Sequence, residues 1–322
     1  MFRKNILNTF PDNRLQILSK SADGKLSIVR VSSDVNPGKF YLYDRDKNRL
    51  RFLYDAMKHI KAEDLSPMMP IVLDARDGAK LHGYITFPKN KNKNLPLIVL
   101  PHGGPHGVRD YWGFNSEVQV LANAGYAVLQ INYRGSDGYG LEFKRAGYKE
   151  WGGLIQRDII DATKWAIKKN IADKNRICIM GASFGAYSAV QSAILEPELY
   201  QCVIANAGVY DLEMMYEEGD IPEVFYGEDY LERVVGKDKK KLKDFSPVYN
   251  LKKLKAEILI AHGVKDRRTP FDQAEALIDG LDDIGKKYEV FVKEKEGHGF
   301  YKDENQAEYL KRVIRFIDRN LH

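Results

Sequence analysis

Cysteine is scarce in this chain, and its scarcity excludes two classes of protein. Among 322 residues only Cys178 and Cys202 are cysteines. Two are too few for a small scaffold held together by disulfides, and their spacing does not suit a zinc site. Each lies inside an apolar, strand-like run, so we expect two buried, reduced thiols, the state that fits a reducing compartment.

Long apolar runs and a strong excess of one charge are also absent. No run approaches the roughly 20 apolar residues of a membrane-spanning helix, and the N-terminal stretch MFRKNILNTFPDN lacks the apolar centre of a signal peptide. Fifty Lys and Arg against 45 Asp and Glu leave a net charge of +5. The basic clusters at 89–93 and 237–243 contain no interleaved aromatics. The sequence predicts a soluble, cytoplasmic protein with neither a membrane nor a nucleic-acid partner.

Short apolar runs alternate with helical patterns from about residue 71 onward. Strands are expected at 71–73, 81–87, 95–100, 127–132, 177–180, 202–206, 258–261 and 288–293, and helices at 114–124, 151–169, 183–195, 271–284 and 305–320. Two strands followed by alternating strand–helix units predict an α/β protein with an eight-stranded, mostly parallel sheet and helices on both faces.

Two segments depart from this alternation. Residues 1–66 contain no clear helix and predict a β-meander of three short strands, with turns at 22–24, 36–38 and 46–48. Such a meander is too small to be stable alone, and Pro67 and Pro70 mark the boundary to a second domain, 67–322. Within that domain, residues 210–244 form a cap-like insertion that we expect to cover the carboxyl edge of the sheet.

A serine interrupts one apolar run in the stretch ICIMGASFGAYSAV, residues 177–190. The first four residues are typical of a buried strand, and the last part is typical of a buried helix. Between them lies G-x-S-x-G, the pattern of a sharp strand-to-helix turn that strains its central residue and needs glycine on either side. We therefore predict that Ser183 is a nucleophile presented at the carboxyl end of the sheet.

A serine hydroxyl is a weak nucleophile and needs a neighbouring base. His298 in EKEGHGF follows the last predicted strand and is the best placed of the seven histidines. Asp266 in AHGVKDRRTP follows the seventh strand and is placed to orient that base, with Asp211 after the sixth strand as the alternative. The chain order Ser183, Asp266, His298 is the order found in the α/β-hydrolase fold.

The oxyanion of the reaction also needs hydrogen-bond donors. The N–H of Phe184, directly after the nucleophile, is one candidate, and a second is the N–H of Gly103 or Gly104 in the loop PHGGPHG. His102 and His106 in the same loop suggest a metal site, but nothing else at ligand spacing supports one, so we favour a structural role.

These stretches together resemble the catalytic domain of the prolyl oligopeptidase family, most closely its acylaminoacyl-peptidase branch. The resemblance covers residues 71–322 and rests on PHGGP (101–105), INYRGSDGYG (131–140), EWGG (150–153) with Asp158 and Asp161, GASFGAY (181–187), HGVKDRRTP with Gln273, and EGHGF (296–300).

The resemblance implies a serine peptidase that forms an acyl-enzyme on short acylated peptides, without metal or cofactor. Ser183, Asp266 and His298 would be its triad, and Phe184 with Gly103 and Gly104 its oxyanion hole. Tyr133 and Arg134 would belong to a loop that shapes the substrate site.

The family carries a β-propeller before its catalytic domain, and the first 66 residues here resemble only the last strands of one. In that family the propeller restricts entry to short peptides. A site without this restriction leaves a carboxylesterase acting on small esters as the alternative function. A catalytically silent binding module is a third hypothesis, against which the complete triad argues. The exposed edges of the meander make a homo-oligomer plausible.

Overall fold

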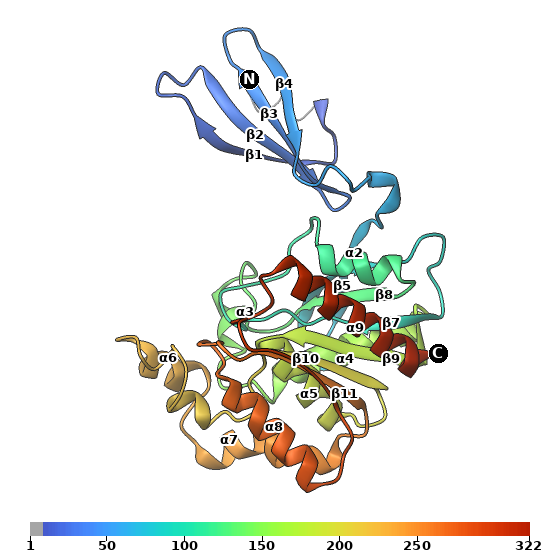
Figure 1. Ribbon diagram of the computed structural model, residues 1–322, viewed down its shortest axis with the longest axis vertical. Helices are drawn as coiled ribbons and strands as arrows, with labels where there is room; N and C mark the ends of the chain where they lie inside the picture. The colour runs from blue at the N-terminus through green and yellow to red at the C-terminus, as the bar shows by residue number, and fades with distance from the viewer. Residues whose placement is uncertain (1–8) are drawn as a thin grey trace.

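The computed structural model describes residues 9–322 and divides them between two β-sheets (Figure 1). A four-stranded antiparallel sheet near the N-terminus has the order β1-β2-β3-β4, and an eight-stranded sheet has the order β12-β11-β10-β9-β7-β8-β6-β5. In the larger sheet only β6 runs against the other strands. The predicted α/β-hydrolase fold, with helices on both faces of a mostly parallel sheet, is confirmed.

The N-terminal sheet contains one strand more than the sequence predicted. Its strands are β1 (Arg14–Lys20), β2 (Leu26–Ser33), β3 (Asn36–Asp44) and β4 (Arg49–Asp55). The predicted turn at 36–38 is also wrong, because Ser33 pairs with Asn36 and the chain turns through the two residues between them. Residues 36–38 begin β3, where proline is tolerated because the first residues of a strand need not donate a ladder hydrogen bond.

The eight strands of the large sheet overlap the eight predicted runs. They are β5 (Met68–Asp74), β6 (Lys80–Thr86), β7 (Leu95–Val99), β8 (Ala127–Asn132), β9 (Ala172–Ala182), β10 (Cys202–Asn206), β11 (Glu257–Gly263) and β12 (Glu289–Lys293). The middle strands β7, β8 and β10 are buried along their whole length. Strands covered on both faces read as continuous apolar runs, which is why the sequence revealed them.

The five predicted helices are present as α2 (Ser116–Asn123), α4 (Leu154–Lys168), α5 (Phe184–Leu195), α8 (Phe271–Asp283) and α9 (Asp303–Leu321). The sequence missed α3 (Leu141–Arg145), which is too short to show a period. The insertion 210–244 contains short helices, as expected: η2 (Met214–Tyr216), α6 (Gly227–Val234) and most of α7 (Lys239–Phe245).

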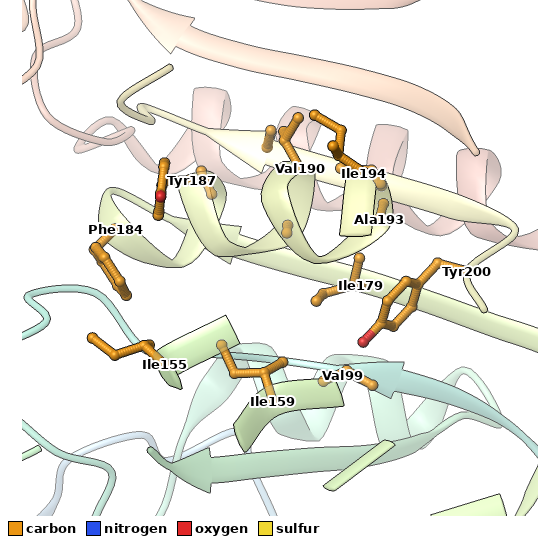
Figure 2. Packing of buried hydrophobic residues seen from close by; sticks show 14 of the residues in the cluster. Val99, Ile155, Ile159, Ile179, Phe184, Tyr187, Val190, Ala193, Ile194 and Tyr200 are labelled. Atoms are coloured by element: carbon orange, nitrogen blue, oxygen red, sulfur yellow. The ribbon is translucent and has the colours of Figure 1, made fainter. Parts of the chain in front are cut away.

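Apolar side chains fill both faces of the large sheet. Residues of α4, α5 and α8 pack on one face, and residues of α2 and α9 pack on the other. Figure 2 shows Ile155 and Ile159 of α4 facing α5, close to Val99 and Ile179 of the sheet. Eleven of the twelve residues of α5 are buried. This helix, which begins directly after Ser183, is therefore held by protein on almost every side.

Two buried side chains attach the N-terminal sheet to the large one. Asp34 accepts a hydrogen bond from the N–H of Met68 at 2.7 Å. Gln119 of α2 accepts from the N–H of Ser66 at 2.9 Å and donates to its carbonyl at 2.8 Å. The backbone of the connecting segment is thus paired with side chains from both sides, as buried backbone groups require.

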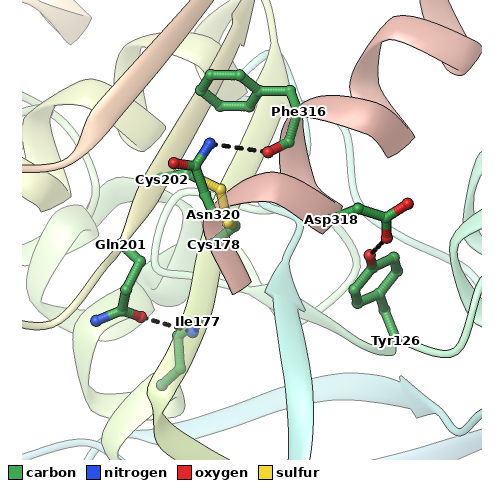
Figure 3. Close-up of a disulfide and its surroundings, with 8 residues drawn as sticks. All are labelled: Tyr126, Ile177, Cys178, Gln201, Cys202, Phe316, Asp318 and Asn320. Carbon is green, nitrogen blue, oxygen red and sulfur yellow. Dashed lines mark hydrogen bonds between the residues drawn. A yellow bond between two sulfur atoms is a disulfide. The ribbon is translucent and has the colours of Figure 1, made fainter. Parts of the chain in front are cut away.

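Cys178 and Cys202 form a disulfide (Figure 3), so the prediction of two reduced thiols is wrong. The parallel register of β9 and β10 sets the two residues directly opposite each other, with their Cα atoms 4.6 Å apart. This separation lies within the range that a disulfide spans. The sequence alone does not give the register of two strands, and the register is what brings these cysteines together.

Within residues 9–322, no helix combines the length and the apolar character needed to cross a bilayer. The sequence predicted that the first thirteen residues are not a signal peptide. Residues 1–8 of that stretch lie outside the described part of the chain.

Thiol titration tests the cysteine pairing. Protein unfolded in denaturant without a reductant should show almost no reactive thiol, and the same sample after reduction should show about two per chain, because both cysteines are buried and bonded in the folded state. Two reactive thiols before reduction would contradict the disulfide.

Candidate active site

The strand-to-helix turn at Ser183 has the strained geometry that its sequence predicted. Ser183 has φ 57° and ψ −125°, a conformation that non-glycine residues rarely adopt. A Cβ on Gly181 would lie 2.4 Å from the backbone of Gly185, and a Cβ on Gly185 would lie 2.3 Å from the carbonyl oxygen of Pro101. Both glycines are therefore required by close backbone packing around the serine.

The backbone around Ser183 is arranged to leave one donor free. The N–H of Ser183 donates to Asn206 at the end of β10 (2.9 Å), and its carbonyl accepts from Ala186 and Tyr187 at 3.0 and 3.2 Å. Phe184 is the first residue of α5, so its N–H points out of the helix without an intrahelical acceptor. This N–H lies at the positive end of the helix dipole.

The loop after β7 passes directly beside the serine. A Cβ on Gly103 would lie 3.3 Å from the carbonyl oxygen of Ala182 and 3.5 Å from the Cβ of Ser183. Gly104 has φ +118° and lines the same cavity as Ser183. The structure thus places both candidate oxyanion glycines next to the nucleophile.

His298 and Asp266 are brought together at the same edge of the sheet. Nδ1 of His298 lies 2.7 Å from Oδ2 of Asp266. With Nδ1 protonated, the imidazole donates to the carboxylate and Nε2 is left to accept a proton. Asp211, the alternative carboxylate, lies elsewhere: it accepts hydrogen bonds from Tyr249 (2.8 Å) and from the N–H of Glu213 (2.9 Å).

The Asp266 carboxylate is surrounded by donors. It accepts hydrogen bonds from the N–H groups of Arg268 and Thr269 at 2.9 and 3.0 Å, and Nε2 of the buried His262 lies 3.5 Å away. Burial alone would raise the pKa of Asp266, but the bonds from His262, His298 and Thr269 outweigh burial and hold the pKa well below its usual range. Asp266 is therefore a permanent negative charge beside the imidazole.

Thr269 contacts both members of this pair and lines the cavity beside Ser183, and sequence reasoning missed it. Its Oγ1 lies 2.9 Å from Asp266 Oδ2, 3.2 Å from His298 Nδ1 and 2.9 Å from the carbonyl oxygen of Ala207. Thr269 also lines the cavity beside Ser183. No hydrogen bond joins the Ser183 hydroxyl to His298 within the described residues, and in many enzymes such a bond tightens only when substrate binds.

The cavity beside Ser183 has a volume of about 430 Å³. Its lining is largely apolar, and the insertion contributes much of it; the apolar residues include Trp151, Phe184, Val209, Ile221, Val224 and Tyr230. Two ion pairs fasten the insertion to the loop that carries Asp266: Arg267 to Glu223 at 3.0 Å and Arg268 to Asp220 at 2.9 Å. The acidic residues at the cavity are therefore neutralised by arginines.

Tyr133 and Arg134 lie in the framework behind the site and do not line this cavity. Tyr133 is fully buried, and its hydroxyl donates to the carbonyl of His102 at 2.7 Å. The Arg134 guanidinium binds the fully buried Asp158, with Nε 2.9 Å from Oδ2, and also pairs with Asp77. The geometry therefore indicates that Tyr133 and Arg134 position the loops around the site and do not contact the substrate directly.

The two histidines of the PHGGPHG loop have partners of their own. His102 Nε2 lies 2.8 Å from the Ser136 hydroxyl, and Trp151 donates to His106 at 3.3 Å. Burial lowers the pKa of each histidine to about 4. In the part of the chain that the structure describes, no group of three or more His, Cys, Asp or Glu side chains is arranged to hold a metal ion.

Comparisons with known proteins identify the family of the chain. A sequence model of the prolyl oligopeptidase family matches residues 112–322. The chain belongs to this family.

Its relatives within the prolyl oligopeptidase family are peptidases. Dipeptidyl aminopeptidase BIII of Pseudoxanthomonas mexicana is 30% identical over 313 residues, covering 92% of this chain and 44% of that protein. The acylamino-acid-releasing enzyme of Arabidopsis thaliana is 30% identical over 234 residues, covering 70% of this chain and 30% of that protein. Pyrococcus horikoshii acylaminoacyl peptidase superposes with a TM-score of 0.82 at 26% identity, covering 96% of this chain and 50% of that one. The chain thus spans half or less of these relatives.

Replacing Thr269 tests whether its hydroxyl positions the relay. Thr269→Val keeps the shape but removes the donor to Asp266, so kcat/KM should fall about tenfold, equivalent to ~1.4 kcal/mol. The carboxylate would then stabilise the protonated imidazole more strongly, and the acidic limb of the pH–rate profile should move to higher pH. Thr269→Ser should restore both. Wild-type turnover and an unshifted profile in Thr269→Val would contradict this role.

Replacing Arg134 separates a framework role from substrate binding. Arg134→Gln leaves the buried Asp158 charge without its partner, so the free energy of unfolding measured with denaturant should fall by about 3–5 kcal/mol. Arg312→Gln, which removes a surface ion pair with Glu289, should cost less than about 1 kcal/mol. Unchanged stability in Arg134→Gln together with a raised KM would instead support substrate contact.

Proposed function

We propose that this chain is the catalytic part of a serine peptidase that releases an N-acylated residue from short peptides through an acyl-enzyme. The observation that carries the proposal is the His298–Asp266 pair, 2.7 Å apart, joined through Thr269 to the cavity of a serine on a strained turn. The family's peptidases support peptide hydrolysis and do not favour the carboxylesterase alternative.

The first half of the reaction follows from the positions of the donors and acceptors. His298 Nε2 removes the proton from Ser183 as the hydroxyl oxygen attacks the scissile carbonyl, and the Asp266 charge stabilises the imidazolium. The carbonyl oxygen becomes an oxyanion, for which the N–H of Phe184 and the N–H of Gly103 or Gly104 are the donors. His298 then protonates the leaving amine, and the acyl group stays on Ser183.

Water completes the cycle by the same groups. His298 removes a proton from a water molecule, which attacks the acyl-enzyme and forms a second oxyanion at the same donors. Collapse of this intermediate returns the proton to Ser183 and releases the acid. Each step needs only the alcohol, the imidazole, the carboxylate and the backbone N–H groups, so we propose no metal or cofactor.

The cavity beside Ser183 favours an acylated residue with a large apolar side chain. Its walls are mainly aliphatic and aromatic, which rewards burial of apolar surface. A free amino terminus would need an unpaired carboxylate, but Asp220 and Glu223 are already bound to arginines. Acylation removes the amine's charge and therefore the need for such a partner.

Three further features of the protein belong to this proposal. Residues 67–322 would form the catalytic domain, with 210–244 as its cap, and residues 1–66 would be the end of a β-propeller. Self-association through the edges of the N-terminal sheet stays a prediction. A cytoplasmic location also stays a prediction, and the Cys178–Cys202 disulfide does not support it.

A substrate panel tests the activity. Acetyl-phenylalanine anilide should be hydrolysed at least about tenfold faster than the same anilide with a free amine, and Ser183→Ala should lose at least about 10³-fold in kcat. Ser116→Ala, at an exposed serine at the start of α2, is the matched control and should retain full turnover.

The other outcomes distinguish the alternatives. Hydrolysis of acetyl-phenylalanine ethyl ester without any anilide hydrolysis would overturn the peptidase and support the esterase. A preference for the free amine would overturn the acyl specificity alone. No turnover of any of the three would support a binding module.

A further inference from the structure

A second cavity, of about 270 Å³, lies between the N-terminal sheet and the segment 109–115. Arginines approach it from both sides: Arg14 of β1 and Arg30 of β2 from the sheet, and Arg109 from the segment. The cavity lining is mostly polar and includes the buried Gln130 of β8. It differs in this respect from the apolar cavity beside Ser183.

In the part of the chain that the structure describes, the three guanidinium groups lack a carboxylate partner, although Nη2 of Arg30 donates to the carbonyl of Pro37 at 2.7 Å. Within the described residues, none of Arg14, Arg30 and Arg109 forms an ion pair with a carboxylate. Arginines of the large domain do form such pairs, among them Arg76, Arg134, Arg267 and Arg268. Nε of Arg30 is buried and has no hydrogen-bond partner. Cations held close together repel one another, and an unpaired buried donor costs free energy, unless an anion binds between them.

Arg109 is held in a fixed orientation for such an anion. Its guanidinium lies over the rings of Tyr111 and Tyr139, 4.6 Å from each centroid, and its Nε donates to the carbonyl of Asp110 at 3.2 Å. A guanidinium stacked on its faces can still donate from its edge. Pre-orientation of this kind reduces the entropy lost when a ligand binds.

Asp110 is the carboxylate that lines this cavity, and it competes weakly with an anionic ligand. One of its oxygens, Oδ2, is buried without a hydrogen-bond partner. Burial raises the pKa of Asp110 to about 7, although Gln130 and Arg109 act against the increase. The group therefore carries less than a full negative charge near neutral pH.

The loop after β7 contributes to both cavities. Its Gly104 lines the first cavity together with Ser183, and its residues 109–115 line the second. The N–H of Asp110 in this loop bonds to Asn132 at the end of β8. A peptide that is bound at Ser183 and extends along this loop would approach the second cavity.

We propose that Arg14, Arg30 and Arg109 form a subsite for the C-terminal carboxylate of the peptide substrate. This inference rests on the proposed peptidase function. A carboxylate is the anion that every unmodified peptide carries at one end, and paired arginines recognise it through parallel N–H donors. With the acylated residue in the apolar cavity, the leaving portion of the peptide extends toward the arginines.

The sheet sets a minimum length for the peptide. β9 and β8 are two strand spacings apart, about 10 Å, and the arginines lie beyond β8 on the side of the N-terminal sheet. Because an extended peptide covers about 3.3 Å per residue, at least about three residues after the scissile bond are needed to bring the carboxylate to the arginines. The subsite therefore does not assist a single-residue leaving group.

Paired substrates test the subsite. Acetylated tetrapeptides of one sequence, beginning with phenylalanine and ending in either a carboxylate or an amide, should differ about tenfold in KM for the wild-type protein, the carboxylate binding more tightly. In Arg14→Gln and Arg30→Gln this ratio should fall toward one. Arg51→Gln, at an exposed position of β4 outside the cavity, is the matched control and should keep the tenfold ratio.

Binding without turnover separates this inference from the proposed function. Titration of Ser183→Ala protein with the same two peptides in a calorimeter should give the same preference for the carboxylate, even if no peptide is cleaved.

An amidated peptide with glutamate as its last residue distinguishes the chain end from an acidic side chain. If this amide binds as tightly as the peptide with a free terminal carboxylate, the chain-end assignment is overturned. Equal affinities for carboxylate and amide in the wild-type and Ser183→Ala proteins would overturn the subsite.

Discussion

The backbone contact between Gly181 and Gly185 is the constraint on which the rest of the active site depends. A Cβ at either position would come within 2.4 Å of other backbone atoms. Only with both glycines do β9, α5 and the loop after β7 meet around Ser183. The serine is thereby held at φ 57°, and the surrounding protein prevents α5 from tilting to relieve that strain. The same contact places Phe184 at the first position of α5, where its N–H has no intrahelical acceptor.

The order of the sheet then determines what surrounds the serine. β10, β11 and β12 follow β9 on one side, so the loops after β11 and β12 bring Asp266 and His298 to the same edge. The N–H of Ser183 donates to Asn206, and the hydroxyl of Thr269 lies within hydrogen-bond distance of the carbonyl of the adjacent Ala207, of Asp266 and of His298. β7 and β8 follow on the other side and bring glycines and cations there. The loop after β7 therefore lines the apolar cavity with Gly104 and the cationic cavity with residues 109–115.

Features that depend on local pattern were predictable from the sequence, and those that depend on register were not. Buried strands read as apolar runs, so all eight strands of the large sheet were found, and strand order alone favoured Asp266 over Asp211 as the partner of His298. The disulfide was missed because it requires β9 and β10 to be aligned residue for residue. The bridging role of Thr269 was missed because three separate segments meet at its hydroxyl. A hydroxyl residue in a turn carries no such signal in the sequence.

A crystal structure of the protein after reaction with a fluorophosphonate tests the central claim most directly, because the adduct imitates the tetrahedral intermediate. We predict a covalent bond to Ser183 Oγ, the phosphonyl oxygen within hydrogen-bond distance of the N–H of Phe184, and Nε2 of His298 within reach of the serine oxygen, with Asp266 still bound to Nδ1. An adduct on another residue, or an imidazole that remains away from the modified serine, would contradict it.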